Sequence, residues 1–170
     1  MLFGGSMQRT KKNHGFTLIE LMVTIAVMAI IAMLAAPSFN NMLISQNLKT
    51  TAFNMKDTLK EARSRAMLNR NDIVVCSSMD QTGVAISTAI CGANLVGYSS
   101  MSIPLQESSV VIANVEKKIT VKAASDTYFI FSPRGNLTTT KTITLCSSVG
   151  SYILTVGIPG TVDITQGAAC

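Results

Sequence analysis

The most hydrophobic part of the chain is residues 16–36, close to the amino terminus. As a helix, this segment would be ~31 Å long, which is enough to cross the core of a bilayer. Glu20 is its one charged residue, and beyond Glu20 the only polar side chain is Thr24. A carboxylate inside a membrane span is unfavourable by a few kcal/mol unless another group neutralises it. The pattern therefore predicts a membrane-spanning helix that needs a partner for Glu20.

A proline, Pro37, follows this segment, and a proline can kink a helix without ending it. Beyond it, apolar residues recur at spacings of mostly three and four, as they do on one face of an amphipathic helix. This stripe consists of Phe39, Met42, Leu43, Leu48, Ala52, Met55, Leu59, Ala62 and Ala66. We expect the helix to continue to about Asn69 and to pack its apolar stripe on a sheet.

From Asn71 onward the pattern changes to short β-type runs, separated by clusters of Gly, Ser, Asn and Pro. The predicted strands cover residues 72–76, 109–115, 118–123, 127–131, 141–146, 152–156 and 161–165. Residues 77–105 have no regular pattern. The sequence therefore predicts an α+β fold, in which a long amino-terminal helix packs on an antiparallel sheet of about five to seven strands.

The chain has four cysteines, Cys76, Cys91, Cys146 and Cys170. They contain no Cys-x-x-Cys pair, and no histidine follows His14, so we expect no structural zinc site. Small exported domains commonly use disulfides, which imply an oxidising compartment such as a periplasm. Of the three possible connectivities, we expect neighbours in the sequence to pair, Cys76 with Cys91 and Cys146 with Cys170.

The formal net charge of the whole chain is +5. Arg9, Lys11 and Lys12 precede the apolar segment. Without them, 11 of the 14 basic side chains remain, and together with the 9 acidic side chains they give a net charge of about +2. A nearly neutral domain attracts nucleic acid only weakly. A basic flank before a membrane span stays in the cytoplasm, so the carboxyl-terminal part is expected on the other side of the membrane.

Four basic residues of the amphipathic helix, Lys49, Lys56, Arg63 and Arg70, recur every seven residues. On a helix this spacing gives a basic ridge, which a nucleic acid or an acidic partner could follow. The alternative is a solvated face opposite the packed stripe. We favour the solvated face, because solubility alone produces one charged ridge on an amphipathic helix.

No combination of residues after residue 15 indicates catalysis. Without a histidine after residue 15, neither a Ser-His-Asp nor a Cys-His nucleophile can form. The carboxylates are scattered singly, and no glycine-rich phosphate loop follows a strand. We therefore expect a structural subunit rather than an enzyme, without cofactor or metal.

Residues 11–20 read KKNHGFTLIE. This string resembles the type III signal of type IV pilins and type II secretion pseudopilins. The resemblance implies that a prepilin peptidase cuts after Gly15 and methylates the new amino terminus at Phe16. It also implies that Glu20 recruits the next subunit and that Pro37 bends the helix. A secretory signal peptide is the alternative, but the long apolar run carries Glu20 and lacks an Ala-x-Ala cleavage site.

The carboxyl-terminal part resembles the GspH/FimT branch of this family. Its landmarks here are residues 62–66 (ARSRA), 129–135 (FIFSPRG) and 144–146 (TLC). Some members bind DNA through a Gly-Arg-x-Arg motif near the last strand, whereas this chain has Gly-Thr-Val-Asp at residues 160–163. The resemblance implies a cleaved leader at 1–15, an assembly helix at 16–36, its amphipathic continuation at 37–70 and a disulfide-stabilised β domain at 71–170.

The resemblance leaves three functions open. The first is a minor pilin that enters and helps to prime a type IV pilus, supporting twitching motility or DNA uptake. The others are a minor pseudopilin of a type II secretion system and a DNA receptor of a competence pilus. The implied partners are other pilins, the prepilin peptidase and, before assembly, the inner membrane of a Gram-negative bacterium. The cysteines and the irregular loop favour the first function, and the missing arginines count against DNA binding.

Overall fold

The computed structural model describes residues 16–170, without the side chains of residues 34–37. The expected leader, including Gly15, lies outside the described residues. The chain divides into two compact units, Met1–Phe39 and Asn40–Cys170. The long helix α1 (Leu18–Asn69) belongs to both of them, and it ends at the residue that the sequence predicted.

Pro37 lies within α1, and a kink at this residue stays a prediction. No straight helix in the described part of the chain is long and apolar enough to cross a membrane. Two segments of α1, Leu18–Met33 and Ser38–Asn69, meet at a bend. Taken together, they are long and apolar enough to cross a membrane, by length and composition only.

The carboxyl-terminal end of α1 is closed by a backbone turn. Arg70 has a φ of 51°, in the left-handed region. The backbone N–H of Asn71 donates to the carbonyl of Ala66 at 3.3 Å, which is the closing bond of a Schellman motif. The chain can thereby reverse direction directly into the first strand.

Seven strands follow, and each lies where the sequence predicted a strand. One sheet has the order β2-β1-β4, and the other has the order β3-β5-β6-β7. Their bounds are β1 (Ile73–Ser77), β2 (Val110–Ala113), β3 (Thr120–Val121), β4 (Tyr128–Phe131), β5 (Lys141–Ser147), β6 (Gly150–Val156) and β7 (Val162–Gly167). The α+β class is confirmed.

Two details of the prediction were wrong. The strands form two sheets rather than one, and β1 pairs with β2 in parallel, in contrast to the antiparallel pairs elsewhere. A parallel pair needs a long crossover connection. The connection is the supposedly irregular segment, which contains α2 (Thr88–Gly92), the 3₁₀ helix η1 (Tyr98–Ser100) and α3 (Ile103–Ser109). Helices this short do not show a helical period in the sequence.

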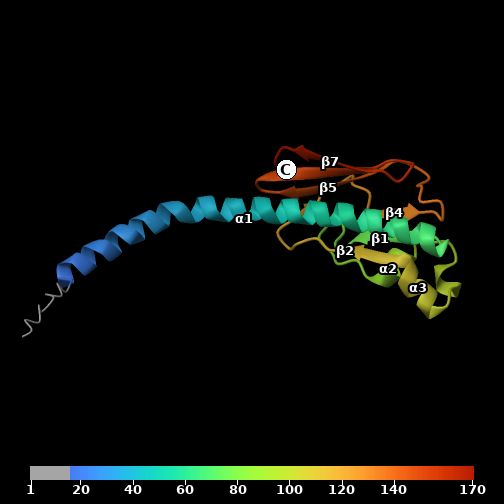
Figure 1. The fold of residues 1–170 in the computed structure, drawn as a ribbon, viewed down its shortest axis with the longest axis horizontal. Coiled ribbons are helices and arrows are strands. Elements are labelled where there is room, and N and C mark those ends of the chain that lie inside the picture. The colour runs from blue at the N-terminus through green and yellow to red at the C-terminus, as the bar shows by residue number, and fades with distance from the viewer. Residues whose placement is uncertain (1–15) are drawn as a thin grey trace, which may run out of the picture. The chain divides into compact units, whose positions relative to one another are not determined.

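The second half of α1 lies along the inner faces of both sheets (Figure 1), and together they enclose the main core. Six residues of the predicted stripe are buried there, namely Leu48, Ala52, Met55, Leu59, Ala62 and Ala66. The first three members, Phe39, Met42 and Leu43, are exposed instead. The apolar spacing therefore identified the buried face correctly only from Leu48 onward.

A second apolar cluster covers the other face of the three-stranded sheet, where Val74 and Val110 pack with Leu95 of the crossover. Two disulfides are present, Cys76–Cys91 between β1 and α2, and Cys146–Cys170 between β5 and the last residue. These are the pairs expected from the sequence. The Cys76–Cys91 disulfide crosslinks β1 and α2 within the second apolar cluster. The Cys146–Cys170 disulfide holds the end of the chain on the four-stranded sheet.

Arg63 joins α1 to two turns of the β domain. Its Nε donates to the carbonyl of Gly135 at 3.0 Å, and the N–H of Leu137 donates to the carbonyl of Ile158 at 2.8 Å. Gly160, with a φ of 76°, packs so closely that a Cβ there would lie 2.2 Å from the Gly135 oxygen and 2.7 Å from Nε of Arg63. The space between Arg63 and both turns accommodates only glycine.

We therefore expect Gly160→Ala to destabilise the domain through both backbone strain and the clash with Gly135, by about 3 kcal/mol. Gly83→Ala is the matched control, because Gly83 also has a positive φ of 83° but has no atom within 4 Å of the new Cβ. Thermal unfolding should show a fall in Tm of roughly 10 °C for Gly160→Ala and roughly 3 °C for Gly83→Ala. Equal falls would contradict the close packing of the two turns.

Candidate assembly surface

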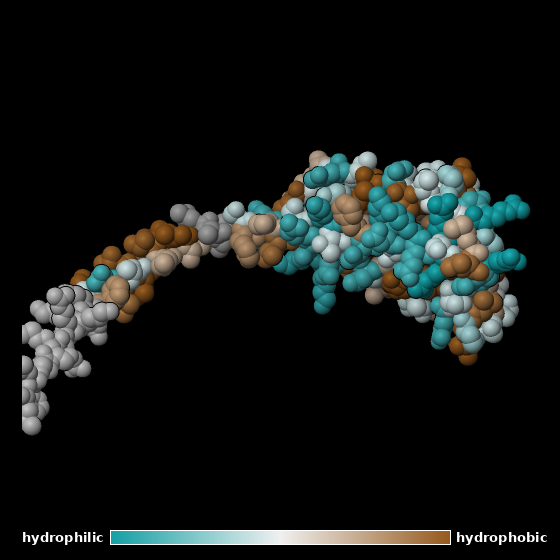
Figure 2. Space-filling view, in the orientation of Figure 1, coloured by the Kyte–Doolittle hydropathy of each residue, from teal (hydrophilic) through white to brown (hydrophobic). Residues whose placement is uncertain are grey.

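The first unit presents an apolar helix that no other described part of that unit covers. Its exposed large side chains are Phe16, Leu18, Ile19, Leu21, Met22, Val23, Ile25, Val27, Met28, Ile30, Ile31 and Met33. Figure 2 shows this segment in brown along most of its described length. An apolar surface of this extent is unfavourable in water, so it requires lipid or other apolar helices around it.

The start of this helix is set by Thr17 and Glu20. The Thr17 hydroxyl accepts a hydrogen bond from the backbone N–H of Glu20 at 3.3 Å. Thr17 is therefore the N-cap of α1 and Glu20 is its third residue, the Thr-x-x-Glu arrangement of a capping box. The helix dipole also favours a negative charge in this first turn. From the sequence, Glu20 was expected to have only an intermolecular role, although the Thr-x-x-Glu spacing also predicts the cap.

Glu20 has no cationic partner in the described part of the chain. The ion pairs among residues 16–170 are Glu61 with Arg65 and Asp126 with Lys141. The first of these pairs joins side chains one turn apart on α1. Because a carboxylate in a low-dielectric environment requires a positive partner, neutralisation of Glu20 falls to another molecule or to residues outside the described range. Phe16, the expected mature amino terminus, is 82 % exposed and accessible to such a partner.

The four residues of the basic ridge are not equivalent. Lys49 and Arg70 are exposed, whereas Lys56 and Arg63 are half-buried. The guanidinium of Arg63 is bound to the Gly135 carbonyl, and Arg70 lies in the left-handed turn that ends α1. Arg63, one member of the ridge, therefore makes a contact that belongs to the fold of the domain. The seven-residue spacing of the basic residues did not reveal this contact.

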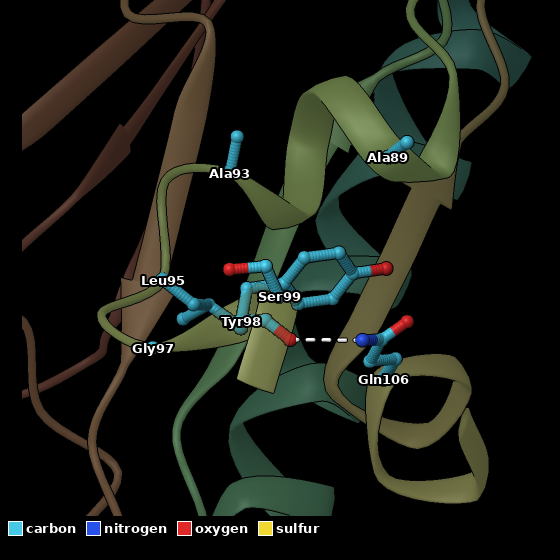
Figure 3. A pocket seen from close by; sticks show the side chains of 7 residues that line it. All are labelled: Ala89, Ala93, Leu95, Gly97, Tyr98, Ser99 and Gln106. Carbon is cyan, nitrogen blue, oxygen red and sulfur yellow. Dashed lines mark hydrogen bonds between the residues drawn. The ribbon is translucent and has the colours of Figure 1, made fainter. Parts of the chain in front are cut away.

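A cavity of about 650 Å³ opens between α2, η1 and α3 (Figure 3). No charged side chain lines it, and Gln106 donates from Nε2 to the Tyr98 carbonyl at 2.9 Å. Its lining contains hydroxyl groups but no base to activate them. A smaller cavity of about 220 Å³ lies beside Tyr128, where the Lys141 ammonium is 3.6 Å from the ring centre.

Asp80 has a distinct electrostatic environment. A hydrogen bond from the Thr82 hydroxyl lowers the pKa of its carboxyl below the usual range, and backbone N–H groups of Val84 and Thr82 contribute further. These bonds close a tight turn at the surface and account for the lowered pKa. Within residues 16–170, no three His, Cys, Asp or Glu side chains are grouped so as to hold a metal ion.

Comparison with known proteins gives two family matches. The prokaryotic N-terminal methylation motif matches residues 10–36, which include the expected cleavage site and the exposed apolar helix. The family of type II transport protein GspH matches residues 51–160. No curated protein matches the chain.

Among solved structures, the type IV minor pilin FimU of Pseudomonas aeruginosa (strain PAO1) is similar. It shares 18 % sequence identity over 74 % of this chain and 96 % of its own, with a TM-score of 0.47. The resemblance to pilins and pseudopilins that we inferred from residues 11–20 is confirmed by the methylation motif. Because the GspH match covers more than half of the sequence, the chain belongs to the family of type II transport protein GspH.

Proposed function

We propose that this protein is a minor pilin that enters a type IV pilus and helps to prime its assembly. The observation that carries the proposal is the methylation motif on an exposed apolar helix whose Glu20 lacks a cation in the described residues. A helix of this kind is suited to packing among other helices of the same type. The β domain supplies a surface to the fibre rather than a catalytic site.

Two charged groups, the Phe16 amine and the Glu20 carboxylate, determine how one subunit is positioned against the next. Cleavage after Gly15 creates a positive amine at Phe16, and Glu20 lies four residues further along the helix. If subunits are staggered along a fibre, the Glu20 carboxylate of one subunit meets the Phe16 amine of its neighbour. Both groups would otherwise be unpaired charges in a low-dielectric core, so their pairing selects one axial register. Close packing of the aliphatic side chains supplies most of the remaining assembly energy.

Before assembly, the helix of residues 16–36 is held in the inner membrane as a single span. The basic residues Arg9, Lys11 and Lys12 keep the leader in the cytoplasm, where the prepilin peptidase removes it. The domain Asn40–Cys170 then lies in the periplasm, whose oxidising conditions suit its two disulfides. The fibre carries that domain outward with it.

A minor pseudopilin of a type II secretion system is the second candidate. The observation that favours it is the family match itself, whose description is a type II transport protein. We prefer the pilus because two disulfides and a disulfide-linked crossover suit a domain exposed outside the cell.

Deletion of the gene separates these two functions. We expect the deletion strain to lose most surface pili and twitching motility and to secrete exoproteins at the wild-type level, with complementation restoring motility. Pilus shearing, a twitching assay and an exoprotein assay measure the three outcomes. Loss of secretion with intact twitching would show that the pseudopilin function is correct.

The role of Glu20 is tested by Glu20→Ala. We expect this variant to be cleaved and methylated normally, because the cut lies before Phe16, but to be reduced about tenfold or more in sheared fibres. Glu20→Asp keeps the charge and should be recovered in part. If Glu20 serves only as the helix cap, Glu20→Gln should enter fibres as the wild type does, since an amide also fits a capping box.

Intact-mass analysis of the membrane fraction gives the control for processing. Wild type and Glu20→Ala should both begin with N-methylated Phe16. Gly15→Val should retain the leader and accumulate in the membrane, because a larger side chain obstructs the peptidase. A mature chain that starts elsewhere would contradict the assignment of the cleavage site.

We also expect the domain Asn40–Cys170 to bind duplex DNA weakly and without sequence preference. Asp163 stands where DNA-binding relatives have arginine, and Arg63 of the ridge is bound to Gly135. With 11 basic and 8 acidic side chains, the domain has a net charge of about +3, which gives little attraction at about 0.15 M salt. A gel-shift titration measures this, and tight binding abolished by Lys49→Ala and Lys56→Ala would instead establish the ridge as a DNA track.

A further inference from the structure

The two disulfides of the domain differ in what surrounds them. Cys76 is 1 % exposed and Cys91 is 0 % exposed, and both belong to the second apolar cluster. The strand β1, which carries Cys76, is the central strand of its sheet, and the crossover that carries Cys91 packs on it. A thiol in solution therefore reaches neither sulfur while these elements stay in place.

The other disulfide lies on the outer face of the four-stranded sheet. Ile143 and Leu145 of β5 are buried in the main core, so the alternate residue Cys146 points away from that core. Cys146 is only 3 % exposed, although it belongs to neither of the two apolar clusters. Its partner Cys170 is exposed. This disulfide is therefore accessible to solvent from the side of Cys170.

Residues 168–170, which we call the strap, connect the end of β7 to Cys146. Gly167 of β7 lies opposite Ser151 of β6, and Ser151 lies opposite Cys146 of β5. Neighbouring strands are about 4.8 Å apart, so this row of three residues is about 10 Å long, a distance that three extended residues can span. The strap therefore runs back across the outer face of the sheet, where Figure 1 marks the carboxyl end of the chain.

Few contacts hold the strap in place. Within residues 16–170, it makes one hydrogen bond besides the disulfide, in which the Ser151 hydroxyl donates to the Ala168 carbonyl at 2.7 Å. All three strap residues are exposed, and none belongs to a helix or strand. In contrast, β7 is held by six backbone pairs with β6. Segments with few contacts open at little free-energy cost, so the strap can open while the sheet stays paired.

We propose that Cys170 is a site of thiol–disulfide exchange in the folded domain, and that the reacting partner is a dithiol. A thiolate of the dithiol attacks Sγ of Cys170, and Cys146 leaves as a thiolate that takes a proton from water. The second thiol of the partner then loses its proton, attacks the mixed disulfide and releases Cys170, which is protonated in turn. The protein disulfide thereby gains two electrons and two protons, and the dithiol is oxidised to a disulfide.

The direction of attack follows from the burial of the two residues. Cys146 is covered and Cys170 is exposed, so an attacking sulfur meets Cys170 first. Exchange at this site opens and closes the strap in the folded domain, whereas Cys76–Cys91 reacts only after the second apolar cluster has opened. The domain thus has one reversible and one permanent disulfide. This holds for a pilin and for a pseudopilin alike, because it concerns the domain alone.

The first test measures how fast each disulfide is reduced in the full-length protein, purified in detergent micelles. Dithiothreitol at about pH 8, where thiolates form, serves as the dithiol. Samples are quenched with iodoacetamide, and peptide mass spectrometry quantifies each alkylated cysteine. We expect Cys146–Cys170 to be reduced at least about a hundredfold faster than Cys76–Cys91, with an unchanged circular dichroism spectrum. Equal rates, or loss of β structure during the first reduction, would overturn the proposal.

The second test changes the hydrogen bond of the strap. Ser151→Ala removes the hydroxyl that is bonded to Ala168, so Cys146–Cys170 should be reduced about threefold faster or more. Ser147→Ala is the matched control, because the Ser147 hydroxyl also donates to a carbonyl, that of Gly150 at 3.1 Å, but on the other face of the sheet. Its rate should stay within about twofold of the wild type, and Cys76–Cys91 should be unaffected in both variants. Equal rates for Ser151→Ala and wild type would show that the strap does not control the exchange.

Discussion

The uncovered apolar helix of residues 16–33 is the constraint on which the rest of the molecule depends. Its side chains have no partner within the described part of their own unit, so the subunit is complete only in lipid or among other helices. This requirement explains why Glu20 is significant, because a carboxylate in those surroundings selects a cationic neighbour. It also explains why the β domain must hold its fold independently, with its own core and two disulfides.

The same helix meets a different environment in its second half. From Leu48 onward, one face is buried against both sheets, with the small residues Ala52, Ala62 and Ala66 fully covered. Small side chains allow the sheets to approach the helix closely, and Arg63 extends this contact to the turns at Gly135 and Gly160. The second half of α1 thus packs against both sheets and forms the centre of the domain core. The first half of the same helix is the apolar segment that other helices or lipid must cover.

Much of this arrangement could be predicted from the sequence, and the failures have physical causes. The strands were located correctly because alternation and turn residues are local signals. Pairing direction is not local, so the parallel β1–β2 pair was missed. The helices of the crossover are shorter than the window in which a helical period appears. At the candidate site, Glu20 was found by motif, but the contact of Arg63 with Gly135 joins residues far apart in the chain and leaves no trace in spacing.

Two different kinds of contact therefore divide the work of assembly. A pair of charges between Phe16 and Glu20 would fix the axial position of a subunit, but it would do so equally for any pilin with the same motif. Selection among related neighbours therefore needs a further surface, which the exposed side chains of residues 16–33 and of the domain Asn40–Cys170 supply.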